Sequence, residues 1–234
     1  NKSINEYDVI WLTHPILLHY VMPYPSSHHR IVYDCMDNVL EFMDAQISPS
    51  YKQWLFSEEK HLISIADLVL FSSKKLQEVV EQRLASKSSQ THLMVNNALS
   101  VSFLRQSTQT NKEDSDWQDF LNLNQNQILI GYFGTISTWF DFKILHKALS
   151  RFPNITFVLF GPTEVDTNPY LEDRMIFWGP IDHTRIHYYM AATHCLIMTF
   201  IISALIETVD PVKLYEYIAT GKPILCPRYV ETEK

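Results

Sequence analysis

A lysine and a glutamate stand one helical turn apart in the segment Asp210–Pro227, which has the pattern of a short helix running into a strand. Asp210 is expected to be the helix N-cap, and Pro211 suits the first helical position. Lys213 and Glu216 then share a face that is separate from the apolar stripe of this helix. That face meets either water, as a surface ion pair, or a ligand. Taken alone, the segment favours the surface ion pair.

A second loop that could bind a ligand follows the apolar run that starts at Ile128. Within this loop Gly134 allows a sharp turn and a close approach of the backbone to a ligand, and Thr135 and Ser137 add hydroxyl groups. In open parallel sheets, ligands bind at the carboxyl ends of strands, where helix N-termini offer free N–H groups to anions. On its own, an ordinary strand-to-helix turn explains this loop better than a binding site does.

Both segments belong to a regular alternation of strand-like and helix-like patterns. The strand-like runs are YDVIWL from Tyr7, RIVYDC from Arg30, DLVLF from Asp67, HLMV from His92, ILIGYFG from Ile128, ITFVLFG ending at Gly161, MIFWG, CLIMTF and PILCP. Helical spacing covers residues 51–65, 73–84, 142–150 and 183–192. Strands separated by helices of this length predict βαβ crossovers and a mainly parallel sheet. The expected fold class is therefore α/β, with two Rossmann-like blocks.

A polar stretch at 105–127 interrupts the alternation and marks the expected domain boundary. The sequence predicts a first domain at 1–104, a linker at 105–127 with a small helix around Trp117–Leu121, and a second domain at 128–234. The first domain has few strands for a doubly wound sheet, and the second stops directly after a strand. We therefore expect both domains to be partial.

Composition narrows the functional class. A hydrophobic fraction of 46% is typical of a globular chain, and no run approaches the roughly 20 apolar residues of a membrane span. The formal net charge of -7 argues against a duplex nucleic-acid partner. Cys35, Cys195 and Cys226 lie far apart in apolar segments, which predicts reduced core thiols and no disulfide or zinc framework. Reduced thiols are typical of a cytoplasmic protein, so a cytoplasmic location is expected.

Four segments together resemble a known family. They are VYDCMDN (32–38), IGYFGTISTWFDF (130–142), FVLFGP (157–162) and DPVKLYEYIATGKPI (210–224). In this order they are similar to GT-B-fold glycosyltransferases, particularly those of bacterial cell-surface polysaccharide synthesis that resemble teichuronic acid enzymes. The resemblance covers most of residues 32–227. It implies an acceptor domain first and a nucleotide-sugar donor domain second.

The resemblance also implies roles for individual residues. Glu216 would accept hydrogen bonds from the two ribose hydroxyls of a nucleotide-sugar, since a carboxylate can accept from both. Gly134 and Thr135 would approach the diphosphate, and Lys213 would neutralise it. Trp178 and Gly179, in the motif Trp-Gly-Pro, match the place where the family's backbone holds the base.

One position departs from the family pattern. A second glutamate is usual eight residues before Glu216, facing the donor sugar, but this chain has Thr208 there. Glu207 stands beside it and is the candidate substitute. The departure leaves both the donor sugar and the inverting or retaining course of the reaction open.

The implied chemistry is displacement at the anomeric carbon of the sugar, with a nucleoside diphosphate as the leaving group. Helix N-termini and Lys213 would stabilise that anion, so neither a metal nor a cofactor is expected. An inverting reaction also needs a general base, for which Asp37 ranks above His14, and Asp34 is a third candidate. A turn or capping role explains Asp37 equally well, and a hydrogen-bonded loop role is favoured for His14.

Other chemical signals are weaker. Asp114-Ser-Asp116 spells a metal-binding Asp-x-Asp, but it lies in the polar stretch, where a solvated linker is the better interpretation. His183 and His187 have the i, i+4 spacing of a zinc pair, yet no third ligand is evident, which favours surface histidines. The chain has no Gly-x-Ser-x-Gly for a hydrolase and no Gly-x-Gly-x-x-Gly for a dinucleotide.

The sequence therefore predicts a glycosyltransferase that moves a sugar from a UDP or GDP type of nucleotide-sugar to a glycan or lipid-linked acceptor. It would be cytoplasmic, with peripheral contact at the inner membrane face left open. Two alternatives remain: a non-catalytic subunit that binds sugar nucleotides or glycans, and a UDP-sugar epimerase of the same fold. No nucleic-acid partner is expected.

Overall fold

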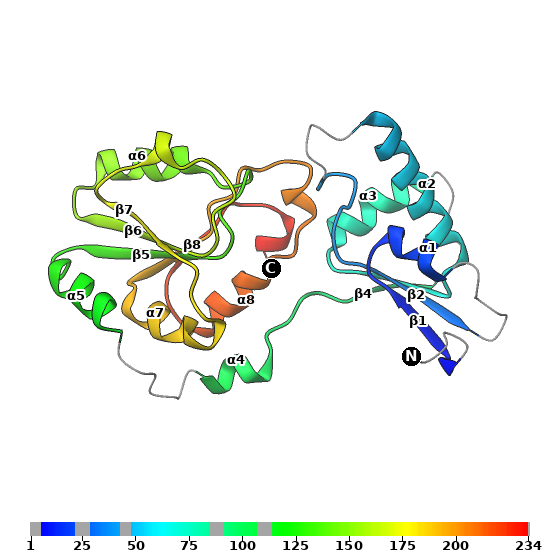
Figure 1. Cartoon of the computed structure of the whole chain (residues 1–234), viewed down its shortest axis with the longest axis horizontal. Helices are drawn as coiled ribbons and strands as arrows, with labels where there is room; N and C mark the ends of the chain where they lie inside the picture. The colour runs from blue at the N-terminus through cyan, green and yellow to red at the C-terminus, as the bar shows by residue number, and fades with distance from the viewer. Residues whose placement is uncertain (1–5, 22–28, 43–47, 85–90, 107–113, 234) are drawn as a thin grey trace. The chain divides into compact units, whose positions relative to one another are not determined.

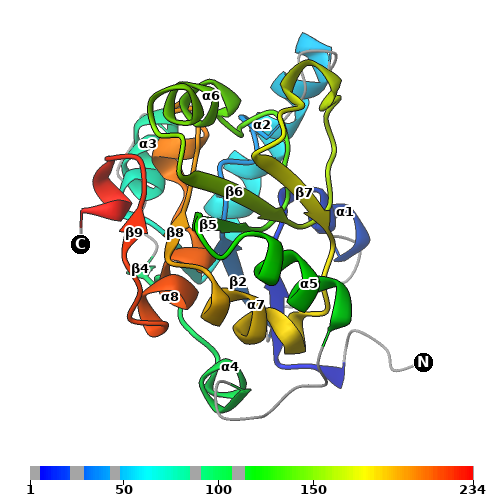
Figure 2. The same ribbon diagram turned by 90° about the vertical axis from the view of Figure 1, so that its left-hand side faces the viewer.

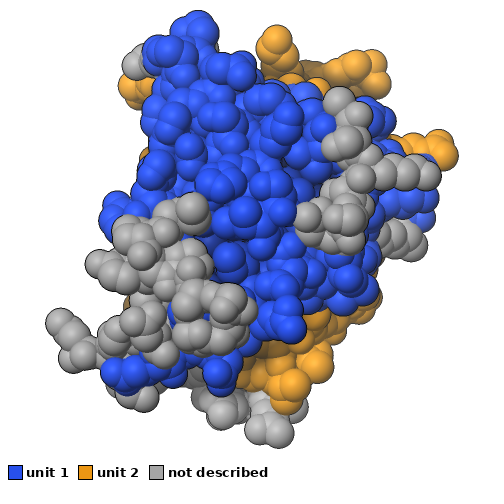
Figure 3. Space-filling view, turned by 90° about the vertical axis from the view of Figure 1, so that its right-hand side faces the viewer, with its two compact units in different colours: residues 1–97, 203–210, 229–234 blue, residues 98–202, 211–228 orange. Residues whose placement is uncertain are grey.

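The computed structural model describes residues 6–21, 29–42, 48–84, 91–106 and 114–233. The chain forms two compact units, coloured separately in Figure 3. Unit 1 comprises Asn1–Asn97, Ser203–Asp210 and Tyr229–Lys234, and unit 2 comprises Ala98–Ile202 and Pro211–Arg228. Two short segments from late in the chain thus join unit 1. The domain limits expected from sequence, at 1–104, 105–127 and 128–234, stay predictions.

Unit 1 contains a four-stranded parallel sheet in the order β1-β2-β3-β4. The strands are β1 (Val9–Leu12), β2 (Arg30–Cys35), β3 (Leu68–Phe71) and β4 (Thr91–Met94). They are connected through η2 (Pro15–Leu17), α1 (Leu18–Val21), α2 (Pro49–Ile65) and α3 (Lys74–Leu84). Each crossover steps to the next strand in the same direction, so right-handed connections place the helices on one face, as Figure 1 shows.

The core of unit 1 lies between this helical layer and the sheet. Leu62 of α2, Val69 and Phe71 of β3, and Leu76 of α3 are completely or almost completely buried in it. Helix α2 begins where the sequence allows, because Ser48 accepts the N–H of Tyr51 as its N-cap and a proline follows. The strands and helices expected in this part of the chain are confirmed.

Two late segments bind the start of α3 within unit 1. They carry the short turns η5 (Ile206–Thr208) and η6 (Val230–Thr232). The Ser73 hydroxyl donates to the carbonyl of Thr208 at 2.6 Å, and the Lys74 N–H donates to the carboxylate of Glu231 at 3.0 Å. The backbone N–H of Lys74, at the N-terminus of α3, is satisfied in this way by Glu231, and the Ser73 hydroxyl joins the start of the helix to η5.

Unit 2 contains a five-stranded parallel sheet in the order β7-β6-β5-β8-β9. The strands are β5 (Ile128–Phe133), β6 (Ile155–Phe160), β7 (Met175–Gly179), β8 (Cys195–Ile197) and β9 (Ile224–Leu225). The helices are α4 (Val101–Gln106), α5 (Ser115–Leu123), α6 (Phe142–Arg151), α7 (Ile186–Ala192) and α8 (Val212–Ala219), with turns η3 (Asn168–Tyr170) and η4 (His183–Arg185).

The direction of strand addition in unit 2 decides which helices cover which face. From β5 the chain adds β6 and β7 on one side, and it then crosses back to add β8 and β9 on the other. Right-handed crossovers in opposite directions lie on opposite faces. Figures 1 and 2 show α6 on one face of the sheet and α7 and α8 on the other. This doubly wound arrangement brings the loop after β5 and the start of α8 to the same sheet edge.

The end of the polar stretch is a folded part of unit 2. The small helix expected around Trp117–Leu121 is confirmed as α5, and the Trp117 side chain is completely buried against aromatic rings that include Phe160 and Tyr189. The interpretation of Asp114 as part of a solvated linker is wrong. Its carboxylate caps α5, accepts the Tyr189 hydroxyl and pairs with Arg185. Residues 107–113 of the expected linker lie outside the described residues.

The cysteines are free, and they differ in burial. Cys35 is buried, Cys195 is half-buried and Cys226 is exposed, so the expectation of a core thiol is wrong for Cys226. Among the described residues, no helix is both long and apolar enough to cross a membrane.

Candidate functional site

Helix α8 carries the lysine and glutamate from which the sequence analysis started. The expectation that Asp210 caps this helix is wrong, because Pro211 is the N-cap residue and no side chain caps the first turn. The Asp210 carboxylate instead accepts the backbone N–H of Asn97 at 2.8 Å, within unit 1. At the other side of the helix, the buried Tyr217 hydroxyl accepts the N–H of Phe133 at 2.8 Å. This bond ties α8 to the carboxyl end of β5.

The loop after β5 passes close to a lysine of α8 at a position whose backbone conformation favours glycine. Gly134 has a φ of 145°, and a Cβ atom there would lie 2.5 Å from Nζ of Lys213. Gly161, after β6, has a φ of 140°, and its Cβ would lie 2.1 Å from the carbonyl oxygen of Gly134. The backbone of two neighbouring strand ends therefore meets without intervening side chains. The sharp turn and close backbone approach expected at Gly134 are present, while its contact with a diphosphate stays a prediction; the close approach at Gly161 was not expected.

Lys213 directs its ammonium group at this glycine loop. Its Nζ donates to the Tyr132 hydroxyl at 3.0 Å and lies 4.6 Å from the Tyr132 ring centroid and 5.0 Å from that of Phe200. Burial lowers the pKa of Lys213 to about 8, while the Glu216 carboxylate acts in the opposite direction. Among the described residues the ammonium forms no ion pair. A lysine ammonium that is bordered by aromatic rings, with no carboxylate in contact among the described residues, suits an anionic ligand.

Tyr132 connects the lysine to the backbone of the glycine loop. Its completely buried hydroxyl accepts from Lys213 and donates to the carbonyl of Thr135 at 2.7 Å. Burial raises the pKa of Tyr132, so the group stays a neutral phenol. The sequence analysis missed this residue, since a tyrosine within a strand pattern indicates only core packing. The Thr135 hydroxyl has no partner among the described residues.

Glu216 is in contact with a histidine that the sequence analysis assigned to the surface. Nε2 of His183, in η4, lies 3.2 Å from Oε1 of Glu216, and the side chains are 62% and 14% exposed. His187 instead contacts the carbonyl oxygen of Phe103 at 2.6 Å. The two histidines thus have separate partners, and the part of the chain that is described holds no cluster of three or more potential metal ligands.

The segment expected to hold the base follows β7. The Trp178 ring is used in packing, with its centroid 5.0 Å from that of Trp117 and 5.6 Å from that of Phe120. Gly179 has a φ of 90°, and nothing lies within 4 Å of the position of a Cβ there. Its carbonyl oxygen accepts the N–H of Gly161 at 2.9 Å. The indole is therefore structural, while the backbone after it borders open space next to the glycine loop.

Glu207 and Thr208, where the sequence departs from the family pattern, lie in η5, within unit 1. Thr208 is buried, and its hydroxyl donates to the carbonyl of Leu205 at 2.7 Å, so it is directed into its own turn. Glu207 is exposed, and its carboxylate has no partner among the described residues. Of these two neighbours, Glu207 is the one with a group free to meet a ligand.

Two of the base candidates, His14 and Asp37, follow the adjacent strands β1 and β2 of unit 1, and Asp34 lies within β2. His14 caps η2, where its Nδ1 accepts the N–H of Ile16 at 3.2 Å, and burial lowers its pKa. Asp37 comes after β2 with its pKa raised by burial, and its carboxylate has no partner in the described part of the chain. Asp34 accepts the indole N–H of Trp11 at 3.1 Å. Asp37 is therefore the least committed of the three.

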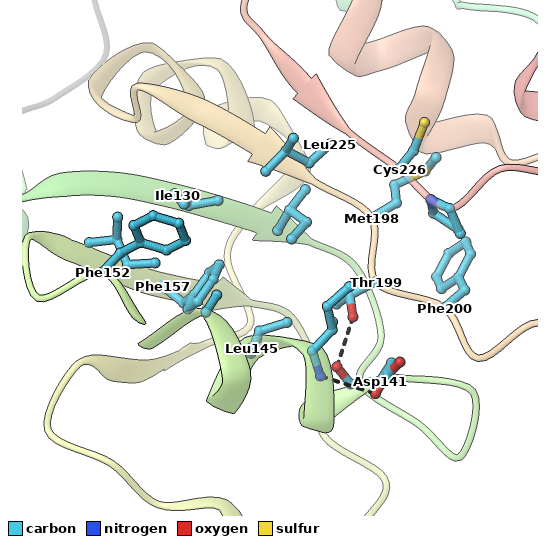
Figure 4. A pocket seen from close by; sticks show the side chains of 15 residues that line it. Ile130, Asp141, Leu145, Phe152, Phe157, Met198, Thr199, Phe200, Leu225 and Cys226 are labelled. Atoms are coloured by element: carbon cyan, nitrogen blue, oxygen red, sulfur yellow. Dashed lines mark hydrogen bonds between the residues drawn. The ribbon is translucent and has the colours of Figure 1, made fainter. Parts of the chain in front are cut away.

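Unit 2 also has an apolar cavity of about 510 Å³ on the α6 side of the sheet (Figure 4). It is lined by residues of α6, β5, β6, β8 and β9, and its one carboxylate, Asp141, caps α6 through Lys143 and Ile144. Phe200 lines this cavity and also borders Lys213. With an apolar lining and no cation among the described residues that line it, the cavity is unsuited to a diphosphate.

Known proteins resemble this chain in sequence and in fold. No protein-family model matches the chain. It is 26% identical over 216 residues to TuaH of Bacillus subtilis, which is named as a teichuronic acid biosynthesis glycosyltransferase. The match covers 89% of this chain and 53% of TuaH. The chain thus spans about half the length of this curated relative.

Solved structures share the fold. Anabaena HepE in complex with UDP matches with a TM-score of 0.71 and 20% identity, over 97% of this chain and 62% of HepE. Sucrose-phosphate synthase from Thermosynechococcus elongatus matches with a TM-score of 0.69 and 17% identity, over 96% and 57% of the two chains. The resemblance inferred from sequence is confirmed: the chain has the α/β fold of GT-B glycosyltransferases, with two Rossmann-like sheets, and its sequence is similar to TuaH.

Proposed function

We propose that unit 2 is the nucleotide-sugar site of a glycosyltransferase that builds a cell-surface polysaccharide. The observation that carries this proposal is the Lys213 ammonium, held at the Gly134 loop without an ion-pair partner among the described residues. The names of TuaH and of the HepE complexes with UDP and UDP-glucose support the same donor class. The acceptor would be a glycan or a lipid-linked sugar.

In this proposal, different residues of unit 2 bind the diphosphate, the ribose and the base of the nucleotide-sugar. Lys213 and the N–H groups of the Gly134–Thr135 loop bind the diphosphate, and Glu216 accepts hydrogen bonds from the ribose hydroxyls. The backbone around Gly179, after Trp178, receives the base. Glu207, which belongs to unit 1, is the candidate for the role that the family gives to a glutamate at position 208.

The proposed reaction is a displacement at the anomeric carbon. The oxygen of an acceptor hydroxyl bonds to that carbon, and the bond from the carbon to the diphosphate oxygen breaks with its electron pair. Lys213 and the N-terminal turn of α8 stabilise the departing anion, which is why we propose that no metal is needed. In an inverting course, Asp37 accepts the proton of the acceptor hydroxyl, with His14 as the second candidate.

Calorimetry with UDP and GDP tests the proposal directly. We expect micromolar to millimolar binding of one nucleotide to the chain, retained when EDTA replaces magnesium. Lys213→Met should weaken it at least tenfold, because a charge-assisted contact to phosphate is lost. Lys147→Met removes an exposed lysine of the same unit and is the matched control. Absence of binding by either nucleotide would overturn the proposed donor site, and loss of binding in EDTA would overturn metal independence.

A non-catalytic sugar-nucleotide-binding subunit is the second candidate. Thr208 favours it, because the hydroxyl at the family's glutamate position is buried and bonded to Leu205. A transfer assay with the full-length protein separates the two: sugar transfer that depends on an acceptor supports the transferase. Nucleotide binding without turnover would support the binding subunit, and release of an epimer from donor alone would support an epimerase. A cytoplasmic location with peripheral membrane contact belongs to the transferase proposal, since a lipid-linked acceptor lies at the membrane.

A further inference from the structure

Glu216 does not form the ion pair with Lys213 that its spacing on the helix would allow. The Lys213 ammonium bonds to the Tyr132 hydroxyl instead, and among the described residues His183 is the hydrogen-bonding partner of Glu216. With 14% of its side chain exposed, Glu216 is a mostly buried carboxylate. Such a group needs its orientation fixed and its charge compensated by neighbours. His183 supplies a donor to Oε1, and no donor to Oε2 is found among the residues that the structure describes.

His183 is itself held by the local backbone. It begins η4, whose N-cap Asp182 accepts the N–H of Thr184 at 2.8 Å and its hydroxyl at 2.6 Å. The Phe103 ring lies 6.0 Å from the His183 ring, centroid to centroid. Because a carboxylate can only accept a hydrogen bond, the proton of this contact is on Nε2 of the histidine. The donor is thus presented from a capped turn that lies outside α8.

We propose that His183 is a positioning residue for nucleotide recognition: it holds one oxygen of Glu216 so that the other accepts the ribose hydroxyls. This inference rests on the proposed function, because the ribose is the ligand that Glu216 receives there. His183 does not touch the reacting atoms and is not a catalytic residue. Its contribution is to fix the carboxylate before the ligand arrives, which lowers the ordering cost of binding.

The test compares dissociation constants of UDP for the chain and three variants by calorimetry, with GDP used if it is the nucleotide bound. His183→Ala should weaken binding by about three- to tenfold, the scale of one ordinary hydrogen bond within a protein. His183→Gln should recover part of the affinity, because its side-chain amide also donates from a similar distance. His146→Ala is the control, since His146 contacts a different carboxylate, Glu172, in the same unit.

A second ligand shows whether the effect passes through Glu216. Wild type and His183→Ala should bind the 2′,3′-dideoxy form of the same nucleotide with equal dissociation constants. This ligand lacks the ribose hydroxyls that Glu216 would bind. Unchanged binding of the normal nucleotide by His183→Ala would overturn the inference. Tighter binding would also overturn it, because it would show that His183 competes with the ligand for Glu216. An equal loss for both nucleotides would also overturn it. If wild type binds neither UDP nor GDP, the proposed function fails first, and this inference fails with it.

Discussion

The ammonium nitrogen of Lys213 lies 2.5 Å from the point that a Cβ atom on Gly134 would occupy. The ammonium of a lysine on α8 therefore occupies the space next to a glycine after β5, although the two residues are far apart in the chain. A side chain at position 134 and the ammonium cannot both be accommodated without a shift. The same space is where the proposed diphosphate meets its cation.

Gly134→Ala should displace Lys213 and weaken binding of the nucleotide at least tenfold. The methyl group would also be strained at a φ of 145°. Gly221→Ala is a matched control, because Gly221 has a φ of 68° but nothing lies within 4 Å of its Cβ position. That control should lose about 1 kcal/mol of stability and keep its dissociation constant. Equal affinities for Gly134→Ala and Gly221→Ala in calorimetry would contradict the prediction.

Tyr132→Phe should weaken nucleotide binding severalfold and lower the free energy of unfolding by about 1–2 kcal/mol. The ring remains to fill the core, but Lys213 and the carbonyl of Thr135 both lose a hydrogen-bond partner. Tyr170→Phe is the control, since Tyr170 stacks on Phe142 and its hydroxyl has no bond within the described residues. Urea unfolding and calorimetry measure the two effects. A variant with the affinity of wild type would show that the tyrosine hydroxyl does not position the lysine.

Nucleotide binding should fall as the pH rises above about 8. Burial lowers the pKa of Lys213 to about 8, so the free site loses its positive charge above that pH, whereas a bound diphosphate favours the ammonium. Binding then requires proton uptake, and affinity should fall by up to about tenfold per pH unit. Dissociation constants measured between pH 7 and 9.5 give the slope. Lys213→Met should abolish it, and a slope that persists in this variant would assign the effect to another group.

The same group should affect stability in the opposite direction. Between pH 8 and the roughly 10.4 of an exposed lysine, the unfolded chain holds a proton that folded Lys213 has lost. The unfolded state binds more protons there, so the contribution of Lys213 to the free energy of unfolding rises with pH. Thermal denaturation across this pH range should therefore show the stability of wild type rising relative to that of Lys213→Met. Parallel curves would mean that the lysine titrates normally.

Glu216→Ala should weaken nucleotide binding by about 1–3 kcal/mol without unfolding the chain, the usual scale for hydrogen bonds to a charged group. Glu172→Ala removes the other carboxylate of unit 2 that contacts a histidine, His146, and should leave binding unchanged. Circular dichroism checks that both variants are folded. If Glu216→Ala keeps the wild-type dissociation constant, Glu216 returns to a structural role at the surface.

The order of elements could be predicted from the sequence because it depends on local patterns. Apolar runs such as Ile128–Phe133 and the helical spacing of Lys74–Leu84 act through their own residues, whatever lies around them. Even the small helix at Trp117 was found in this way within a polar stretch. Motif positions such as Gly134 could be located for the same reason.

What could not be predicted depends on partners distant in the chain. Asp210 was expected to cap its own helix, but Asn97, 113 residues earlier, binds its carboxylate. The Tyr132 hydroxyl meets a lysine 81 positions away, and His183 meets a glutamate 33 positions away. No local pattern encodes such pairs. Candidate binding residues could thus be proposed from motifs, while the residues that contact them could not.

The backbone contact between Gly161 and Gly134 has a consequence for the thermodynamics of binding. Where these two strand ends meet, neither residue has side-chain torsions, so a ligand that settles on them freezes no rotamers. The shape of this surface is determined when the chain folds, and its conformational entropy has already been lost by then. Binding at this part of the site should therefore be governed by enthalpy and desolvation.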